Sequence, residues 1–111
     1  MCIRDSNWFD LQKVDEPYMS RVFPIKNEKK YLIPAVVHCD GTGRLQTVEK
    51  LNNKKFFALI EKFFKITGVP ILLNTSFNEN EPIVSNYKQA IDCFLRTKID
   101  VLILNNFMIL R

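Results

Sequence analysis

The strongest pattern along the chain is a stripe of apolar residues at helical spacing, which occurs twice. The first stripe recurs at i, i+4, i+7 and i+8: Phe56, Ile60, Phe63 and Phe64. The second recurs at i, i+3, i+4, i+7 and i+8: Tyr87, Ala90, Ile91, Phe94 and Leu95. A single apolar face of this kind predicts an amphipathic helix. With Asn53 as an N-cap and Gly68 as a stop, we expect helices over residues 53–67 and 87–97.

Shorter runs of apolar, aromatic or β-branched residues predict strands. The five runs lie at residues 18–25, 35–39, 71–73, 101–104 and 107–110. Residues 40–43 read Asp-Gly-Thr-Gly, and glycines that accept a positive φ suit a tight turn. We therefore expect a β-hairpin over residues 35–48, a polar turn at 27–30 and an extended piece at 83–84. The order β, β-hairpin, α, β, α, β, β predicts an α/β or α+β fold with helices on at least one face of its sheet.

Charge is concentrated in one part of the chain. Of 111 residues 25% are charged and 47% hydrophobic, which excludes a disordered class, and the net charge is +4. Residues 44–65 hold six basic and two acidic residues, so this segment carries the whole excess of positive charge. A nucleic-acid interface would combine these bases with the phenylalanines between them. The helical spacing of those phenylalanines instead favours an ordinary amphipathic helix with lysines in solvent, so we do not expect nucleic acid as a partner.

Several classes are excluded by what the sequence lacks. No apolar run approaches the roughly 20 residues that a membrane helix needs. Three cysteines without CxxC spacing and a single histidine argue against a disulfide framework and a metal site, and predict reduced thiols in a cytoplasmic protein. The polar residues 1–6 look like read-through from an artificial or mis-called reading frame, so we expect no structural role for them. We treat residues 1–16 as poorly defined and 17–111 as the domain.

Candidate chemistry gathers first at residues 38–44. A carboxylate, a hydroxyl, a guanidinium and two permissive glycines occur within seven residues: His38, Asp40, Gly41, Thr42 and Arg44 carry the signal. Glycine lets a backbone approach a ligand closely, and arginine binds phosphate or carboxylate with a planar fork. The alternative is a tight hairpin in which Asp40 caps the turn and Arg44 is solvated. The residues alone leave both interpretations open.

A second candidate loop covers residues 74–82 and follows a predicted buried strand directly. Ligands of open α/β sheets bind beyond the carboxyl ends of strands. Four neutral polar residues on this loop suit an amide or a nucleotide better than a metal: Asn74, Thr75, Ser76 and Asn78. Glu79 and Glu81 are weaker acid/base candidates, because paired carboxylates on a loop are usually solvated. Ser76 is a weak nucleophile candidate, because nothing places the single histidine beside it.

These two segments resemble a known family. Residues 34–48 read PAVVHCDGTGRLQTV and resemble the PAVxHxDGTxRxQTV block of O-carbamoyltransferases, which include the nodulation-factor, cephamycin and tobramycin enzymes. Residues 67–78 read TGVPILLNTSFN and resemble its TGxPxLLNTSFN block. Residues 81–84 match EPIV, and residues 90–104 resemble a further block. The resemblance covers roughly residues 17–111.

The resemblance implies a two-domain enzyme. An N-terminal actin-like ATPase-fold domain transfers the carbamoyl group, and a C-terminal YrdC-like domain joins ATP and carbamoyl phosphate into carbamoyl-adenylate. We expect this chain to be an N-terminally truncated YrdC-like domain with two main helices, inactive alone because it lacks the family's KxRExFRPFAP and GPRALG segments. Its expected partners are carbamoyl phosphate, ATP with Mg bound mainly through the missing parts, and the missing transferase domain.

The resemblance also implies roles for single residues. Arg44 would contact the phosphate or carbamoyl end of the intermediate, and Ser76 would hydrogen-bond the carbamoyl group. Asn74 and Thr75 would shape the pocket, while Asp40 and His38 would fix the turn and Arg44. We place Gly41, Thr42 and Asn78 in the same substrate- or nucleotide-binding set. Two alternatives stay open: a small basic nucleotide- or RNA-binding module, and a protein–protein module with a phenylalanine-rich face.

Overall fold

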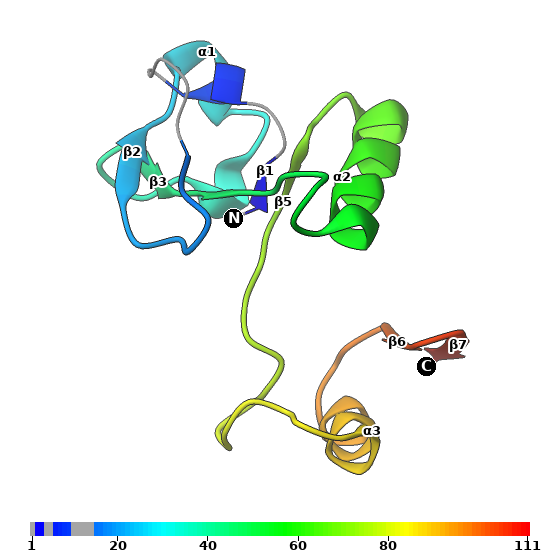
Figure 1. The fold of residues 1–111 in the computed structure, drawn as a ribbon. Coiled ribbons are helices and arrows are strands. Elements are labelled where there is room, and N and C mark those ends of the chain that lie inside the picture. The colour runs from blue at the N-terminus through cyan, green and yellow to red at the C-terminus, as the bar shows by residue number, and fades with distance from the viewer. Residues whose placement is uncertain (1, 4–5, 10–14) are drawn as a thin grey trace. The chain divides into compact units, whose positions relative to one another are not determined.

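The computed structural model describes residues 2–3, 6–9 and 15–111. The chain divides into two compact units, Met1–Asn74 and Thr75–Arg111, which are described separately here. Helices and small sheets are mixed in the chain, so the fold is α+β as expected (Figure 1). No helix in the described part of the chain is both long enough and apolar enough to cross a membrane.

The first unit contains two small sheets. β1 (Cys2–Ile3) is the middle strand of three, parallel to β4 (Gln46–Thr47) and antiparallel to β5 (Ile71–Leu72). β2 (Val22–Pro24) pairs antiparallel with β3 (Thr42–Arg44) in the other sheet. The expectation that residues 1–6 have no structural role is wrong for Cys2 and Ile3, because both are buried in a paired strand.

The predicted hairpin over residues 35–48 is wrong. Residues 34–36 form a 3-10 turn, η2 (Pro34–Val36), and β3 takes its partner from residues 22–24. Proline fixes φ near the helical value and suits the first position of a helical turn, so Pro34 starts η2 where a strand was expected. Two other expectations differ as well. The polar turn at 27–30 is a short helix, α1 (Asn27–Lys30), and residues 83–84 form no strand.

The first main helix agrees with its prediction. α2 (Lys54–Thr67) begins at Asn53, whose Oδ1 accepts a hydrogen bond from the Phe56 N–H at 3.1 Å. It ends at Gly68, which has a left-handed φ of 73°. Ile60 is fully buried in a cluster with Cys2 and Val48, whereas the lysines of α2 are exposed. The amphipathic interpretation of the basic segment is therefore confirmed.

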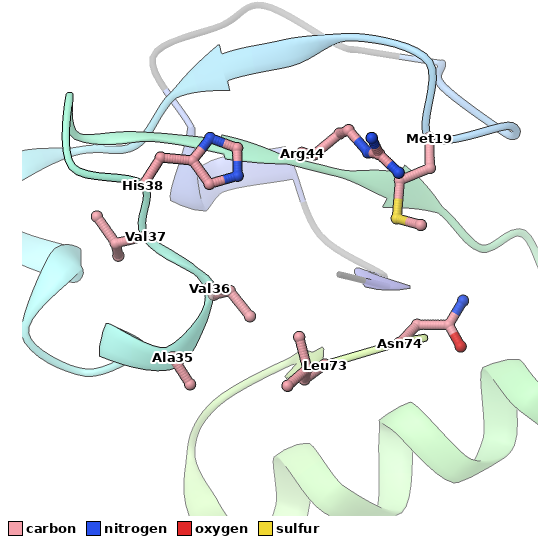
Figure 2. Close-up of a pocket in the computed structure, with 8 residues that line it drawn as sticks. All are labelled: Met19, Ala35, Val36, Val37, His38, Arg44, Leu73 and Asn74. Carbon is pink, nitrogen blue, oxygen red and sulfur yellow. The ribbon is translucent and has the colours of Figure 1, made fainter. Parts of the chain in front are cut away.

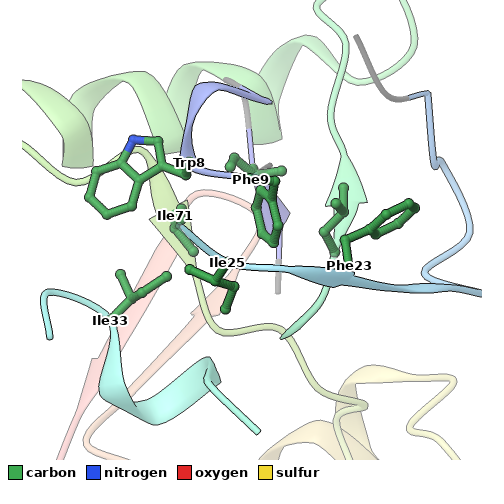
Figure 3. Packing of buried hydrophobic residues seen from close by; sticks show 8 residues of the cluster. Trp8, Phe9, Phe23, Ile25, Ile33 and Ile71 are labelled. Carbon is green, nitrogen blue, oxygen red and sulfur yellow. The ribbon is translucent and has the colours of Figure 1, made fainter. Parts of the chain in front are cut away.

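The main core of the first unit joins segments that are distant in sequence (Figure 3). It includes Trp8, at the end of the 3-10 turn η1 (Ser6–Trp8), and Phe23 of β2 and Ile71 of β5. The buried members are Ile3, Trp8, Phe9, Phe23, Ile25, Ile33, Leu45 and Ile71. Burial of an aliphatic or aromatic side chain contributes roughly 1.5–3 kcal/mol. The same core thus holds β2, β3 and β5 together, and Arg44 is the last residue of β3, while Asn74 lies two residues beyond β5.

The second unit is a helix followed by a β-hairpin. α3 (Tyr87–Arg96) begins at Asn86, whose Oδ1 accepts from the Gln89 N–H at 3.0 Å. β6 (Val101–Leu104) and β7 (Phe107–Leu110) have the predicted bounds, and they pair antiparallel with each other. The buried face of α3 is shifted from the predicted stripe. Ala90, Cys93 and Phe94 are buried, and Ala90 and Phe94 pack with Leu102 of β6, whereas the two ends of the stripe, Tyr87 and Leu95, are exposed.

Candidate functional site

The turn between residues 38 and 42 is closed by its own polar groups. Asp40 Oδ1 accepts hydrogen bonds from the Thr42 N–H at 2.9 Å and from Thr42 Oγ1 at 2.7 Å. His38 Nδ1 lies 3.0 Å from the same Thr42 hydroxyl. The hydrogen bonds from the Thr42 side chain and backbone lower the pKa of Asp40, so its carboxylate is charged at neutral pH. Asp40 therefore caps the turn, and Gly41 supplies the left-handed φ of 79° that the turn requires.

A cavity of about 180 Å³ lies beside this turn (Figure 2). Three of the residues predicted from the sequence line it: His38, Arg44 of β3, and Asn74, which follows β5. The remaining lining residues are Met19, Ala35, Val36, Val37 and Leu73. The cavity thus brings one guanidinium, one imidazole and one amide together with five apolar side chains. Arg44, His38 and Asn74 are all exposed to solvent, so a ligand can reach their polar groups.

Gln46 of β4 connects two walls of this cavity. Its Nε2 donates a hydrogen bond to the carbonyl of Pro17 at 2.7 Å, and its Oε1 accepts one from Asn74 Nδ2 at 3.4 Å. Gln46 therefore ties the segment carrying Met19 to the loop carrying Asn74. Sequence reasoning missed Gln46 and Met19 as site residues. The only available signal was that Gln46 lies in the block of residues 34–48 and that Met19 lies within residues 17–111, which the resemblance covers.

The other three predicted site residues, Thr75, Ser76 and Asn78, belong to the second unit. Thr75 and Ser76 are exposed. Asn78 is partly buried, and its Nδ2 donates to the Glu81 carbonyl at 2.8 Å, within the same loop. Asn78 therefore closes the loop with its side chain, a role that the sequence did not predict.

Arg96 of α3 binds the carboxylates of this loop. Its Nη1 lies 2.6 Å from Glu79 Oε2, its Nη2 lies 2.8 Å from Glu81 Oε1, and its Nε lies 3.0 Å from Asp92 Oδ2. Hydrogen bonds from the backbone N–H groups of Glu81 itself and Asn80, together with Arg96, lower the pKa of Glu81 to about 2. Glu81 is thus ionised at neutral pH, which argues against a general-acid role for it.

Acid should break the Arg96 network in a defined pH range. The pKa of Glu81 falls from an ordinary 4.5 to about 2 on folding. The folded state therefore binds fewer protons than the unfolded state between these values, and Glu81 stabilises the fold above pH 4.5. That contribution should be lost as the pH falls from 4.5 through about 2. We expect the Glu81 carboxyl ¹³C signal to titrate near 2.

The matching stability measurement uses two variants. Glu81→Gln should flatten the dependence of melting temperature on pH over this acid range, whereas Glu28→Gln, an exposed glutamate of α1, should leave it as in the parent chain. A Glu81 carboxyl signal that titrates at its ordinary value of 4.5 would contradict the role given to the network.

Comparison with known proteins adds to this geometry. Residues 3–111 match the family described as Carbamoyltransferase C-terminus. Nodulation protein NolNO of Sinorhizobium fredii is 48% identical over 94 residues, which cover 84% of this chain and 14% of that protein. Nodulation protein NolO of Bradyrhizobium diazoefficiens is 44% identical over 94 residues, which cover 84% of this chain and 17% of that protein. Nodulation protein U of Rhizobium tropici is 43% identical over 63 residues, which cover 57% of this chain and 11% of that protein.

The chain spans less than a fifth of the length of these relatives. The family match nevertheless extends through both units and includes every candidate residue from His38 to Asn78. It confirms the resemblance carried by the three sequence blocks. This chain accordingly belongs to the Carbamoyltransferase C-terminus family.

Proposed function

We propose that this chain contributes, within a longer O-carbamoyltransferase, the site that forms or holds carbamoyl-adenylate made from ATP and carbamoyl phosphate. Formation of the adenylate would consume one water and release phosphate from carbamoyl phosphate and pyrophosphate from ATP. The carbamoyl group would then pass to a hydroxyl of the acceptor substrate, with AMP as the leaving group. The observation that carries the proposal is the cavity in which Arg44, His38 and Asn74 meet. Its chemistry suits the two ends of carbamoyl phosphate, and the family to which the chain belongs points to carbamoyl transfer.

Two polar groups of the cavity match the two ends of that molecule. The Arg44 guanidinium offers a charged, planar fork to phosphate oxygens. The Asn74 amide is both donor and acceptor, and so complements the C=O and NH₂ of a carbamoyl group. Ser76 is proposed to hydrogen-bond the carbamoyl group on the strength of its sequence block. At about 180 Å³ the cavity is smaller than the roughly 300–1,000 Å³ of typical ligand pockets. It suits a small acyl phosphate better than a whole nucleotide.

ATP therefore needs surface beyond this cavity. The residues described by the structure include no group of three or more His, Cys, Asp and Glu side chains placed to hold a metal ion. They thus fit poorly as a self-sufficient Mg²⁺ site, and we derive no step through that ion. We propose that the remainder of the longer protein, including an N-terminal transferase domain, binds most of the Mg–ATP and the acceptor.

Titration of the 111-residue chain with carbamoyl phosphate tests this proposal. We expect weak binding that shifts the backbone amide signals of residues 38–44 and Asn74, and no release of pyrophosphate from ATP by this chain alone. Inorganic phosphate, which lacks the carbamoyl end, should shift the Arg44 region but leave Asn74 in place. Shifts confined to other residues would show that this cavity is not the site. Tight binding of both ligands with turnover would show that the chain alone is sufficient.

A further inference from the structure

A buried carboxylate, Glu16, lies three residues before Met19 of the cavity wall and outside the set of residues assigned above. Glu16 is 2% exposed and is the single buried charged residue within the described ranges. Its Oε1 accepts hydrogen bonds from the Ser20 N–H at 3.1 Å and from Ser20 Oγ at 2.6 Å. Its Oε2 pairs with Arg21 Nε at 2.6 Å. Both oxygens are thus used to hold the start of the segment that leads into β2.

The backbone around Glu16 is fixed to β4. The Glu16 N–H donates to Thr47 Oγ1 at 3.0 Å, and the Thr47 N–H donates to the Glu16 carbonyl at 2.8 Å. The hydrogen bond from Gln46 to the Pro17 carbonyl adds a third attachment. The segment from Glu16 to Ser20 is therefore bound at its beginning by β4 and at its end by the Glu16 side chain.

Met19 lies inside this closed segment and has an unusual backbone. Its φ is 57°, in the left-handed region that non-glycine residues rarely adopt. Such conformations persist where surrounding contacts impose them, and they cluster at functional sites. The Met19 side chain lines the same cavity as Arg44 and Asn74 (Figure 2). The hydrogen bonds of Ser20 to the Glu16 carboxylate close the backbone around Met19, one residue further on.

We propose that Glu16 is a positioning residue, which holds the turn of residues 17–20 so that Met19 forms one wall of the cavity and limits the size of the acyl phosphate admitted there. This inference rests on the proposed function of the cavity. A charged carboxylate is needed for the task, because it accepts from three donors at once. The hydrogen bonds of Ser20 and Arg21 lower the pKa of Glu16 to about 2, so the charge is present throughout the neutral range.

The first test follows the methyl groups of methionine by ¹³C NMR in the 111-residue chain. In Glu16→Gln, an amide replaces the acceptor that faces Arg21, and the turn should loosen. We expect the Met19 methyl signal to move toward the position of an unstructured methionine, while the signal of Met108 in the second unit stays in place. Carbamoyl phosphate should bind about tenfold more weakly. Glu28→Gln, the same change at an exposed site of this unit, should alter none of these.

A second variant separates the wall from the turn. Met19→Gly accepts a positive φ without strain, so the turn should persist while the wall is removed. We expect the melting temperature to stay unchanged and the assigned Met19 methyl signal to disappear. The ratio of the affinity for carbamoyl phosphate to that for the bulkier phenyl phosphate should fall. If Glu16→Gln does not fold, Ser20→Ala removes one hydroxyl donor from the same carboxylate and should shift the Met19 methyl signal in the same direction.

The outcomes distinguish this inference from the proposed function. A Met19 methyl signal that keeps its original position in Glu16→Gln and Ser20→Ala would overturn the positioning role, whatever the ligand does. A Met19 signal that moves in a chain that never binds carbamoyl phosphate would support the positioning role and overturn the proposed function. An unchanged ligand preference in Met19→Gly would overturn the part of the inference that concerns ligand size.

Discussion

Replacing Arg44 by alanine should slow carbamoyl phosphate-dependent release of pyrophosphate by roughly a hundredfold to a thousandfold in a full-length protein that carries this domain. Arg44 is the cation of the cavity, and it faces the place where phosphate charge would be held. Removing one preorganised donor from such a site costs a rate factor of this size because no other charge in the cavity replaces it. Arg44→Lys keeps the charge but loses the planar fork, so its rate of pyrophosphate release should lie between that of the parent protein and that of Arg44→Ala.

Stability and a matched control decide how that result is interpreted. Arg44 is exposed on β3, so Arg44→Ala should change the free energy of unfolding by no more than about 0.5 kcal/mol. Lys62→Ala removes an exposed positive charge from α2 of the same unit and should leave pyrophosphate release unaltered. If Arg44→Ala releases pyrophosphate at the parent rate, Arg44 has no role in the reaction and the cavity loses its main assignment.

The largest loss of stability is expected from Ile60→Ala. Ile60 is 0% exposed and lies on the inner face of α2, where it packs with Cys2 and Val48. Removing a buried aliphatic side chain costs about 2–5 kcal/mol, because the lost burial adds to the energy of the cavity left behind. That cost is a large fraction of the roughly 5–15 kcal/mol that stabilise a typical domain. Urea denaturation followed by circular dichroism measures it.

The neighbouring leucine supplies the control for this variant. Leu59 is 55% exposed on the same helix, so Leu59→Ala makes a similar change in size with little loss of burial. We expect Leu59→Ala to stay within about 0.5 kcal/mol of the parent chain. Alanine is the strongest helix former, so neither loss can come from helix propensity. Equal losses from the two variants would show that the burial of Ile60 does not account for the effect.

The helices were predictable because their determinants are local. The bounds of α2 follow from the cap at Asn53, the apolar period around Ile60 and the left-handed Gly68, all within one stretch of sequence. The pairing of β3 with β2 was not predictable in the same way. It depends on tertiary contacts with residues 22–24, which are distant in sequence. The nearby segment expected to pair with β3 contains η2, which Pro34 starts.

The candidate site likewise contains residues that could be predicted from short stretches of sequence and residues that could not. His38, Arg44 and Asn74 were predicted because their side chains have recognisable chemistry in short blocks, and the structure places these three around one cavity. Glu16 and Met19 were missed, because a glutamate in sequence reads as a surface residue and a methionine as a core residue. The burial of the first and the positive φ of the second become visible only in the folded chain, where Glu16 bonds both to Thr47 of β4 and to Ser20 beside Met19.

Two of the strand pairs in the described part of the chain differ in how far apart their partners lie in sequence. Leu104 faces Phe107 across a two-residue turn, whereas Pro24 faces Thr42 across residues 25–41, which include the cavity residues 35–38. Short loops close in microseconds or less, and contacts between distant residues slow folding because chain entropy is lost before they form. The β6–β7 hairpin should therefore form early during folding. Arg44 reaches its place only when β2 and β3 meet, so the cavity is assembled late.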